Sequence, residues 1–128
     1  MLITDLLSFS CLGLNFNSSH FPGEVAEEPL EVYNKASIEI GYKIHVHCKD
    51  DSLNDLDEYV FSMRKIGSYD YNDKYLVVQS PGVKSTYRIA MKVPNIKSLS
   101  QLEGSLVIFS DDCRGRVVMP IKSKVTTA

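Results

Sequence analysis

The stretch that decides the fold is Ile38-Glu39-Ile40-Gly41-Tyr42-Lys43-Ile44-His45-Val46-His47-Cys48. Its side chains alternate without a break between an apolar set and a set that is polar or small. Successive side chains of an extended chain point to opposite faces, so this alternation predicts a half-buried β-strand. Burying each large apolar side chain contributes roughly 1.5–3 kcal/mol, which holds the register of such a strand firmly. We therefore expect the central strand of an antiparallel sheet here.

Further extended segments, separated by turn signals, surround this strand. The N-terminal pieces 2–9 and 12–16 are interpreted as one first strand that bends at Gly13, and a turn-rich segment follows over residues 15–23. The later strands are expected over residues 24–34, 59–66, 75–79, 85–93, 105–110 and 116–124. Strand 24–34 is expected to pair with the central strand, because a short polar turn joins them.

Two segments are open to another interpretation. Residues 49–58 are acidic and are expected to form a solvated loop or a single helical turn. Residues 95–103 carry Ile96, Leu99 and Leu102 at three-residue spacing, which suggests one turn of helix. Seven or eight strands without a long helical pattern favour an all-β sandwich over a parallel sheet, which needs crossover helices.

Length and composition indicate one globular domain over residues 1–128, with its core at about 12–125. The net charge is −2, from 14 basic and 16 acidic residues, so the positive field that attracts phosphate is missing and no nucleic-acid partner is expected. No apolar run approaches the roughly eighteen residues of a membrane span. The first ten residues lack a basic start and contain Asp5, so we expect no signal peptide.

Cysteine usage favours a reducing compartment. Cys11, Cys48 and Cys113 are odd in number and widely spaced, without a C-x-x-C pair. A disulfide framework or a zinc site needs a pattern that this chain lacks, so buried thiols are the better interpretation. One bridge with one spare thiol remains an alternative.

Four short motifs follow one another along the chain. They are Leu14-Asn15-Phe16 with Phe21-Pro22-Gly23-Glu24; Leu30-Glu31-Val32-Tyr33-Asn34; Ile89-Ala90-Met91-Lys92-Val93-Pro94; and Glu103-Gly104-Ser105-Leu106-Val107-Ile108 with Arg116-Val117-Val118-Met119-Pro120-Ile121. In these motifs the chain resembles the ASH domain, a cytoplasmic relative of the PapD and major-sperm-protein sandwiches. The motifs resemble the family's patterns L-x-F…G, L-x-L-x-N, V-x-F-x-P and G-x-L-x-I…V-x-V-P-L, in the family's order. Residues 49–74 depart from it, being longer and more polar than in a minimal member.

The resemblance implies an immunoglobulin-like (PapD-like) antiparallel β-sandwich of seven to eight strands. It also implies a non-catalytic protein–protein interaction module in the cytoplasm, at the cytoskeleton, within a centrosomal or ciliary scaffold. Centrosomal or axonemal proteins would then be its partners, and neither a cofactor nor a small-molecule substrate is expected. The chain would be a small protein or one domain cut from a larger scaffold. The alternative function is a major-sperm-protein-like peptide-binding adaptor or a chaperone-type sandwich.

The polar residues offer few candidates for other chemistry. His45 and His47 share one strand face and would chelate a metal if a carboxylate or a cysteine lay opposite, although an ordinary polar face is the commoner arrangement. The acidic run over residues 50–58 lacks the glycine and the ligand spacing of a calcium loop. Neither a G-x-S-x-G motif nor a phosphate-binding loop is present, so we expect no enzymatic activity and no metal site.

Two groups of side chains are candidates for protein binding. Tyr69, Tyr71 and Tyr75 lie in or beside a polar loop, and tyrosine is enriched at protein interfaces because it is large, rigid and amphipathic. The alternative is that these rings cap one end of the sandwich. Arg116, Lys122 and Lys124 line the outward face of the last strand. They would bind an acidic peptide or protect an edge strand from unwanted pairing.

Overall fold

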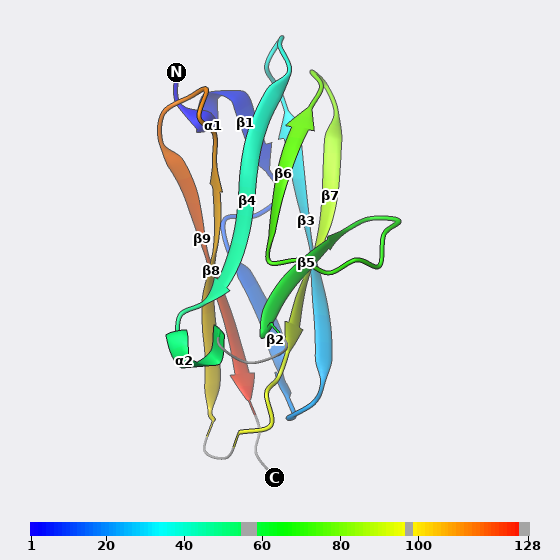
Figure 1. The fold of residues 1–128 in the computed structure, drawn as a ribbon, viewed down its shortest axis with the longest axis vertical. Coiled ribbons are helices and arrows are strands. Elements are labelled where there is room, and N and C mark those ends of the chain that lie inside the picture. Colours follow the sequence, from blue (N-terminus) through cyan, green and yellow to red (C-terminus); the bar gives the residue numbers. More distant parts are fainter. Residues whose placement is uncertain (55–58, 97–98, 126–128) are drawn as a thin grey trace.

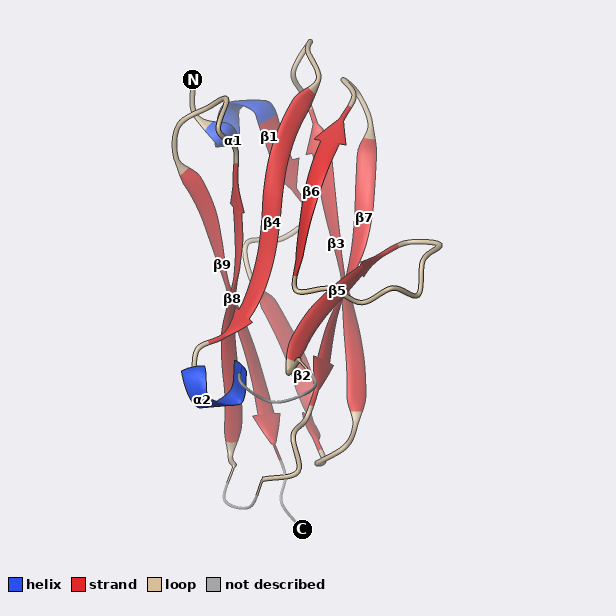
Figure 2. Ribbon diagram, viewed as in Figure 1, coloured by secondary structure: helices blue, strands red, loops and turns tan. Residues whose placement is uncertain are grey.

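The computed structural model describes residues 1–54, 59–96 and 99–125, and it consists mainly of β-strands in two layers (Figures 1 and 2). The elements in chain order are α1 (Ile3–Leu6), β1 (Leu7–Phe9), β2 (Leu14–His20), β3 (Val25–Asn34), β4 (Ile40–Cys48), α2 (Asp51–Asn54), β5 (Phe61–Lys65), β6 (Lys74–Gln79), β7 (Lys84–Lys92), β8 (Gln101–Phe109) and β9 (Arg116–Val125). The described helices are single turns, and none of them is long enough to cross a membrane.

The strands form two sheets that face each other. One has the order β1-β3-β7-β5 and the other the order β2-β9-β8-β4-β6. Strand pairing is antiparallel throughout except between β2 and β9, which are parallel. This arrangement confirms the all-β sandwich. The described residues contain nine strands rather than seven or eight, because the N-terminal pieces expected to form one bent strand are two strands in different sheets.

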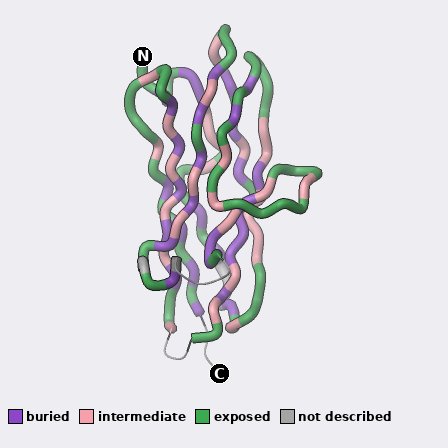
Figure 3. Tube along the Cα trace, in the orientation of Figure 1, coloured by how far each residue is buried: buried purple, intermediate pink, exposed green. Residues whose placement is uncertain are grey.

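Strand β4 confirms the central strand predicted from its alternation. It lies between β8 and β6, and the side chains of Ile40, Tyr42, Ile44, Val46 and Cys48 are each at most 2% exposed. Buried positions alternate along β4 with positions that are partly or fully exposed (Figure 3), so the buried side chains share the face that looks into the space between the sheets. The preceding Ile38, which continues the pattern in sequence, is 62% exposed and lies outside the strand.

A buried polar network joins the two sheets inside the apolar core. Gln79 in β6 donates through Nε2 to the carbonyl of Val32 in β3 at 2.9 Å, and Asn34 in β3 donates through Nδ2 to the carbonyl of Gln79 at 2.9 Å. The hydroxyl of Tyr42 donates to Gln79 Oε1 at 2.8 Å and lies 2.7 Å from that of Tyr87 in β7. Burial raises the pKa of both tyrosines, so they stay neutral donors. The network ties β6 to the opposite layer.

The N-terminal segment differs from its prediction. Residues 3–6, expected to be extended, form helix α1, and only Leu7–Phe9 continue as strand β1, paired with β3. After a bend at residues 11–13, strand β2 runs on to His20 through a region expected to be rich in turns. The chain passes from one sheet to the other at this bend, so β1 pairs with β3 and β2 pairs with β9. Gly13 allows the change because a Cβ there would lie 3.3 Å from the ring of Pro120.

The expected pairing of segment 24–34 with the central strand is wrong. Strand β3 pairs with β1 and β7, whereas β4 pairs with β6 and β8 in the other sheet. Both strands have one apolar face, and each buries it in the core between the two layers. Alternation shows that a strand has an apolar face but not whether its chain neighbour lies beside it or opposite it.

Two further expectations need correction. The helical turn expected at 95–103 is absent from the described part of that segment, since residues 95–96 and 99–100 are irregular and β8 begins at Gln101. The strand expected over residues 59–66 begins later, at Phe61, so Tyr59 precedes β5 and is 51% exposed, while Phe61 and Met63 are buried. In the acidic segment, α2 confirms a helical turn at residues 51–54, and residues 55–58 lie outside the described residues.

None of the three cysteines forms a disulfide. Cys48 is buried on β4, whereas Cys11 and Cys113 are partly exposed. No disulfide links the described residues, so cohesion there comes from the apolar core and the polar network. The core cluster begins at Ile3 and ends at Val125 and therefore includes the helical turn α1.

Candidate protein-binding surfaces

The tyrosine loop, residues 66–73 between β5 and β6, projects from the side of the sandwich (Figure 1). Most of it is exposed (Figure 3), and Tyr69 is 84% exposed with the guanidinium carbon of Arg64 5.4 Å from its ring centroid. Tyr71 instead donates its hydroxyl to Glu27 Oε2 at 2.7 Å. Tyr69 is therefore accessible to a partner, while Tyr71 fastens the loop to β3.

Arg64 reinforces this attachment. Its Nε and Nη2 donate to the two carboxylate oxygens of Glu27 at 2.9 and 3.1 Å, and its Nη1 donates to the carbonyl of Ser68 at 3.2 Å. The bonds from Arg64 lower the pKa of Glu27, with burial opposing and the bond from Tyr71 assisting. Glu27 in turn raises the pKa of Tyr71. One bidentate ion pair thus holds the start of the loop on the outer face of the four-stranded sheet.

Tyr75 lies apart from the other two tyrosines. It belongs to β6 and donates its hydroxyl to the carbonyl of Asp70 at 2.7 Å, while its ring lies 6.4 Å from that of Tyr87. The ammonium of Lys65 is 5.4 Å from the ring centroid. Tyr75 is thus partly buried beneath the loop, which favours the capping interpretation for this residue.

The basic residues of β9 occupy the outer face of the five-stranded sheet. Arg116 stands opposite Phe109, Lys122 opposite Glu103 and Lys124 opposite Gln101. Strand geometry separates Arg116 from Lys122 by about 20 Å. The interpretation that these residues protect an edge is wrong for Lys122 and Lys124, because β9 pairs there with both β8 and β2, whereas Arg116 lies on the stretch of β9 that β2 does not reach. The six predicted residues therefore lie on different faces and form no single site.

A hollow on the same outer face was missed from the sequence. Its volume is about 610 Å³. It is lined by Lys43, Ile44, His45, Lys74, Tyr75, Leu76 and Phe109. We call it the β6 hollow. A smaller hollow of about 180 Å³ adjoins it and shares Lys43, Leu76 and Phe109. The sequence signal for this hollow is the run Tyr75-Leu76-Val77-Val78. Its odd- and even-numbered residues are both apolar, although one of these two sets must face solvent.

The histidine pair borders this hollow without a third ligand. The rings of His45 and His47 stack with centroids 5.3 Å apart, and His45 Nε2 lies 3.8 Å from a carboxylate oxygen of Asp73. Burial, followed by the neighbouring His47, lowers the pKa of His45, although Asp73 acts in the opposite direction. Among the described residues, no three histidine, cysteine or acidic side chains are placed to hold a metal ion. The two histidines therefore belong to the outer face of β4.

Strand β6 leaves one row of backbone groups open. The N–H of Val46 donates to the carbonyl of Asp73 at 2.8 Å, and the same register continues along β6. Residues of an antiparallel strand direct their N–H and C=O alternately to the two sides. The odd-numbered residues therefore face β4, and Lys74, Leu76 and Val78 direct their backbone groups to the open side. Leu76 and Val78 also expose 74% and 66% of their surface.

The β5 edge, by contrast, is closed by the chain itself. Met63 donates its N–H to the carbonyl of Asn72 at 2.8 Å and accepts the N–H of Asn72 at 2.9 Å. Ser68 donates to the carbonyl of Lys65 at 3.0 Å. The tyrosine loop therefore covers the middle and the end of this edge, so no added strand can pair there without displacing it.

The remaining edges carry features that discourage strand addition. Strand β1 has three residues, and β2 has a register shift between Phe16 and Ser19. Pro29 lies on the part of β3 that extends beyond its pairing with β1. Pro120 lies on the part of β9 that extends beyond its pairing with β2. Short strands, bulges and prolines protect natural sheets from edge pairing. Within the described residues, β6 is the edge that lacks such a feature over most of its length.

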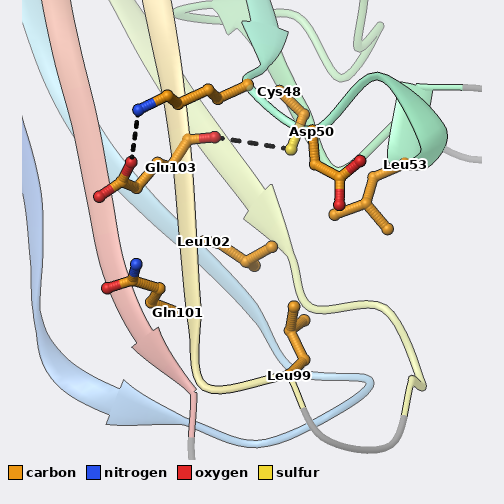
Figure 4. A pocket seen from close by; sticks show the side chains of 8 residues that line it. Cys48, Asp50, Leu53, Leu99, Gln101, Leu102 and Glu103 are labelled. Atoms are coloured by element: carbon orange, nitrogen blue, oxygen red, sulfur yellow. Dashed lines mark hydrogen bonds and ion pairs between the residues drawn. The ribbon is translucent and has the colours of Figure 1, made fainter.

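A cavity of about 220 Å³ lies at the other end of β4, next to α2 (Figure 4). Cys48 directs its thiol toward the carbonyl of Glu103 at 3.6 Å, and Lys49 pairs with the Glu103 carboxylate at 3.2 Å. Leu53, Leu99 and Leu102 form its apolar wall (Figure 4). These contacts close the end of the sandwich, and we assign this cavity no chemistry.

No family model and no curated protein matches this chain in sequence. Solved structures do match its fold. The ASH/PapD-like domain 7 of human CEP192 aligns with a TM-score of 0.58 and 12% identity, over 95% of this chain and 86% of that domain. The E. coli chaperone DraB aligns with a TM-score of 0.52 and 13% identity, over 93% of this chain and 54% of the chaperone.

A family 123 glycoside hydrolase from Clostridium perfringens aligns with a TM-score of 0.62 and 8% identity. The match covers 90% of this chain but 23% of the hydrolase. Identities this low indicate a shared fold and nothing about activity. Together with the two-sheet topology, the likenesses to the CEP192 domain and to DraB confirm that the chain has a PapD-like, immunoglobulin-like β-sandwich fold.

Proposed function

We propose that this chain, which has the PapD-like fold, is a non-catalytic protein-interaction module of a centrosomal or ciliary scaffold, acting in the cytoplasm at the cytoskeleton. The observation that carries the proposal is the open β6 edge. An exposed edge strand is a template for pairing with another chain, and natural sheets usually blunt it. Here the other edges are blunted and β6 presents two exposed apolar side chains. The motif order of the ASH domain supports the choice of scaffold.

The second candidate is a peptide-binding adaptor or a chaperone-type sandwich, which the β6 hollow favours. Lys43 and Lys74 flank its apolar wall of Leu76 and Phe109, so a peptide with acidic and apolar side chains would fit there. The two candidates use neighbouring surfaces. They differ in whether the bound segment adds a strand to the edge or lies across the face of the sheet.

Proximity labelling in cultured ciliated cells tests the proposal. Residues 1–128 would be fused to a labelling enzyme as wild type, as Val78→Lys and as Val118→Lys. Both valines lie on the outer face of the five-stranded sheet and are 66% and 55% exposed, but Val118 belongs to β9 and lies away from the β6 edge. We expect the wild type and Val118→Lys to label centrosomal or axonemal proteins and Val78→Lys to lose them. Equal labelling by all three forms, or no enrichment of such proteins, would contradict the proposal.

A further inference from the structure

We infer that the β6 edge takes up an extended segment of a partner protein as an added antiparallel strand, whose sequence pattern is apolar-x-apolar-x-acidic. This inference rests on the proposed function and specifies the partner's chemistry. Three residues of β6, Lys74, Leu76 and Val78, direct both backbone groups to the open side. Only another extended backbone offers donors and acceptors at the matching spacing, so the occupant is a strand.

The side chains of the edge define the pattern. Leu76 and Val78 point to the outer face at alternate positions, and residues directly opposite each other in a strand pair share a face. The partner residues opposite them are therefore apolar. Antiparallel pairing is the rule for the sheet neighbours here and is slightly the more stable arrangement. An antiparallel partner meets Val78 first and Lys74 last.

Charge places the acidic residue at the end of the pattern. Lys74 stands opposite His45 on β4 and has no carboxylate partner in the described part of the chain. Asp73 faces His45 at 3.8 Å and leaves Lys74 exposed. A carboxylate opposite Lys74 would therefore meet its ammonium group.

A second copy of the chain fits this edge less well. Antiparallel self-pairing centred on Leu76 would place Lys74 of each copy opposite Val78 of the other. Each ammonium would then meet an apolar side chain rather than a carboxylate. A foreign segment with the acidic residue is therefore the better occupant, and self-association becomes an outcome to be tested.

Fluorescence anisotropy with defined peptides tests the inference on the full chain. The probe is a labelled heptapeptide, Ser-Val-Thr-Ile-Thr-Glu-Ser, blocked at both ends, and its control is the reversed core Glu-Thr-Ile-Thr-Val between the same serines. We expect the reversed peptide to bind about tenfold more weakly. N-methylation of the isoleucine should weaken binding by at least about tenfold, because that amide faces β6, whereas N-methylation of either threonine should change it little.

Protein variants complete the design. Val78→Lys should weaken binding about tenfold, while the matched Val118→Lys should leave it within about twofold. Lys74→Glu should weaken binding of the glutamate peptide and restore binding of a peptide with lysine in its place. Equal effects of N-methylation at isoleucine and threonine, or equal binding of the reversed peptide, would overturn the inference. So would a dimer in sedimentation that Val78→Lys dissolves, since the occupant would then be a second copy.

The peptide experiment tests the inferred binding pattern, and the cell experiment tests the proposed function. If the peptides do not bind while Val78→Lys still loses its centrosomal or axonemal partners in cells, the inferred pattern is wrong and the proposed function stands. If the peptides bind as expected but no form labels such proteins, the edge recognises this pattern and the proposed scaffold is wrong.

Discussion

Strands β5 and β6 end their respective sheets and are joined by the tyrosine loop, yet one edge is closed and the other is open. Met63 in β5 exchanges two backbone hydrogen bonds with Asn72 of the loop, whereas Lys74, Leu76 and Val78 in β6 direct theirs to solvent. The two strands are five and six residues long, so strand length does not explain the difference. The folding of the loop over one edge protects that edge and leaves the other available for a partner.

The largest expected effect comes from disturbing the packing of β5. A Cβ on Gly104 in β8 would lie 2.6 Å from the carbonyl oxygen of His47 and 2.7 Å from the ring of Phe61, the first residue of β5. Gly104→Ala should therefore lower the free energy of unfolding by about 3 kcal/mol, measured by denaturant titration. Gly41→Ala is the matched control, because its nearest contact would be 3.8 Å away. Similar midpoints for both variants would argue against this close approach.

The next largest effect is expected from removing the hydrogen bonds that tie β6 to the opposite sheet. Gln79→Leu would remove the buried bonds from Gln79 Nε2 to the carbonyls of Val32 and Val83 and the bond from the Tyr42 hydroxyl to Gln79 Oε1. We expect a loss of about 2 kcal/mol in unfolding free energy. Gln101→Leu, at an exposed position in β8, should change it by less than about 0.5 kcal/mol. An unchanged stability for Gln79→Leu would show that the network contributes little.

Opening the β5 edge should produce a smaller change. Asn72→Pro removes the N–H that bonds to Met63, whereas Asn72→Ala retains it. We expect the proline variant to lose about 1 kcal/mol and to exchange the amide hydrogen of Met63 faster than the alanine variant does. If the loop closes this edge, the proline variant should also gain a tendency to self-associate. Equal exchange rates in the two variants would indicate that the loop does not protect β5.

The smallest expected effect is on how the free energy of unfolding depends on pH in the acid range. The pKa of Glu27 is lower in the folded chain than its ordinary value of 4.5, chiefly because Arg64 bonds to the carboxylate. Its contribution to stability is therefore present above about pH 4.5 and is lost as the pH falls through the lowered pKa. Glu27→Gln should remove this part of the slope of unfolding free energy between about pH 5 and pH 3. Glu31→Gln serves as the control, and identical slopes for both variants would exclude a special role of the Arg64 pair.

The candidate surface was predicted only in part. Tyr69 is exposed, but Tyr71 and Tyr75 use their hydroxyls to hold the loop, and Arg116 and Lys124 lie near opposite ends of β9. A tyrosine in a polar loop has the same sequence signal whether it holds the loop or faces a partner. The distinction depends on a carboxylate from β3 and a carbonyl in the loop, which no local pattern places there.

The alternation of side chains by itself determined that this chain is a β-sandwich and which face of most strands is buried, because a period of two and the burial of apolar surface act residue by residue. Only the tertiary structure decided which strands are neighbours, where the N-terminal strand changes sheets and which edge stays open. Those features depend on contacts between segments far apart in the chain, such as Gly104 with Phe61 and Asn34 with Gln79. Hydrophobic pattern is a local property, whereas the exposure of an edge depends on every segment that could cover it.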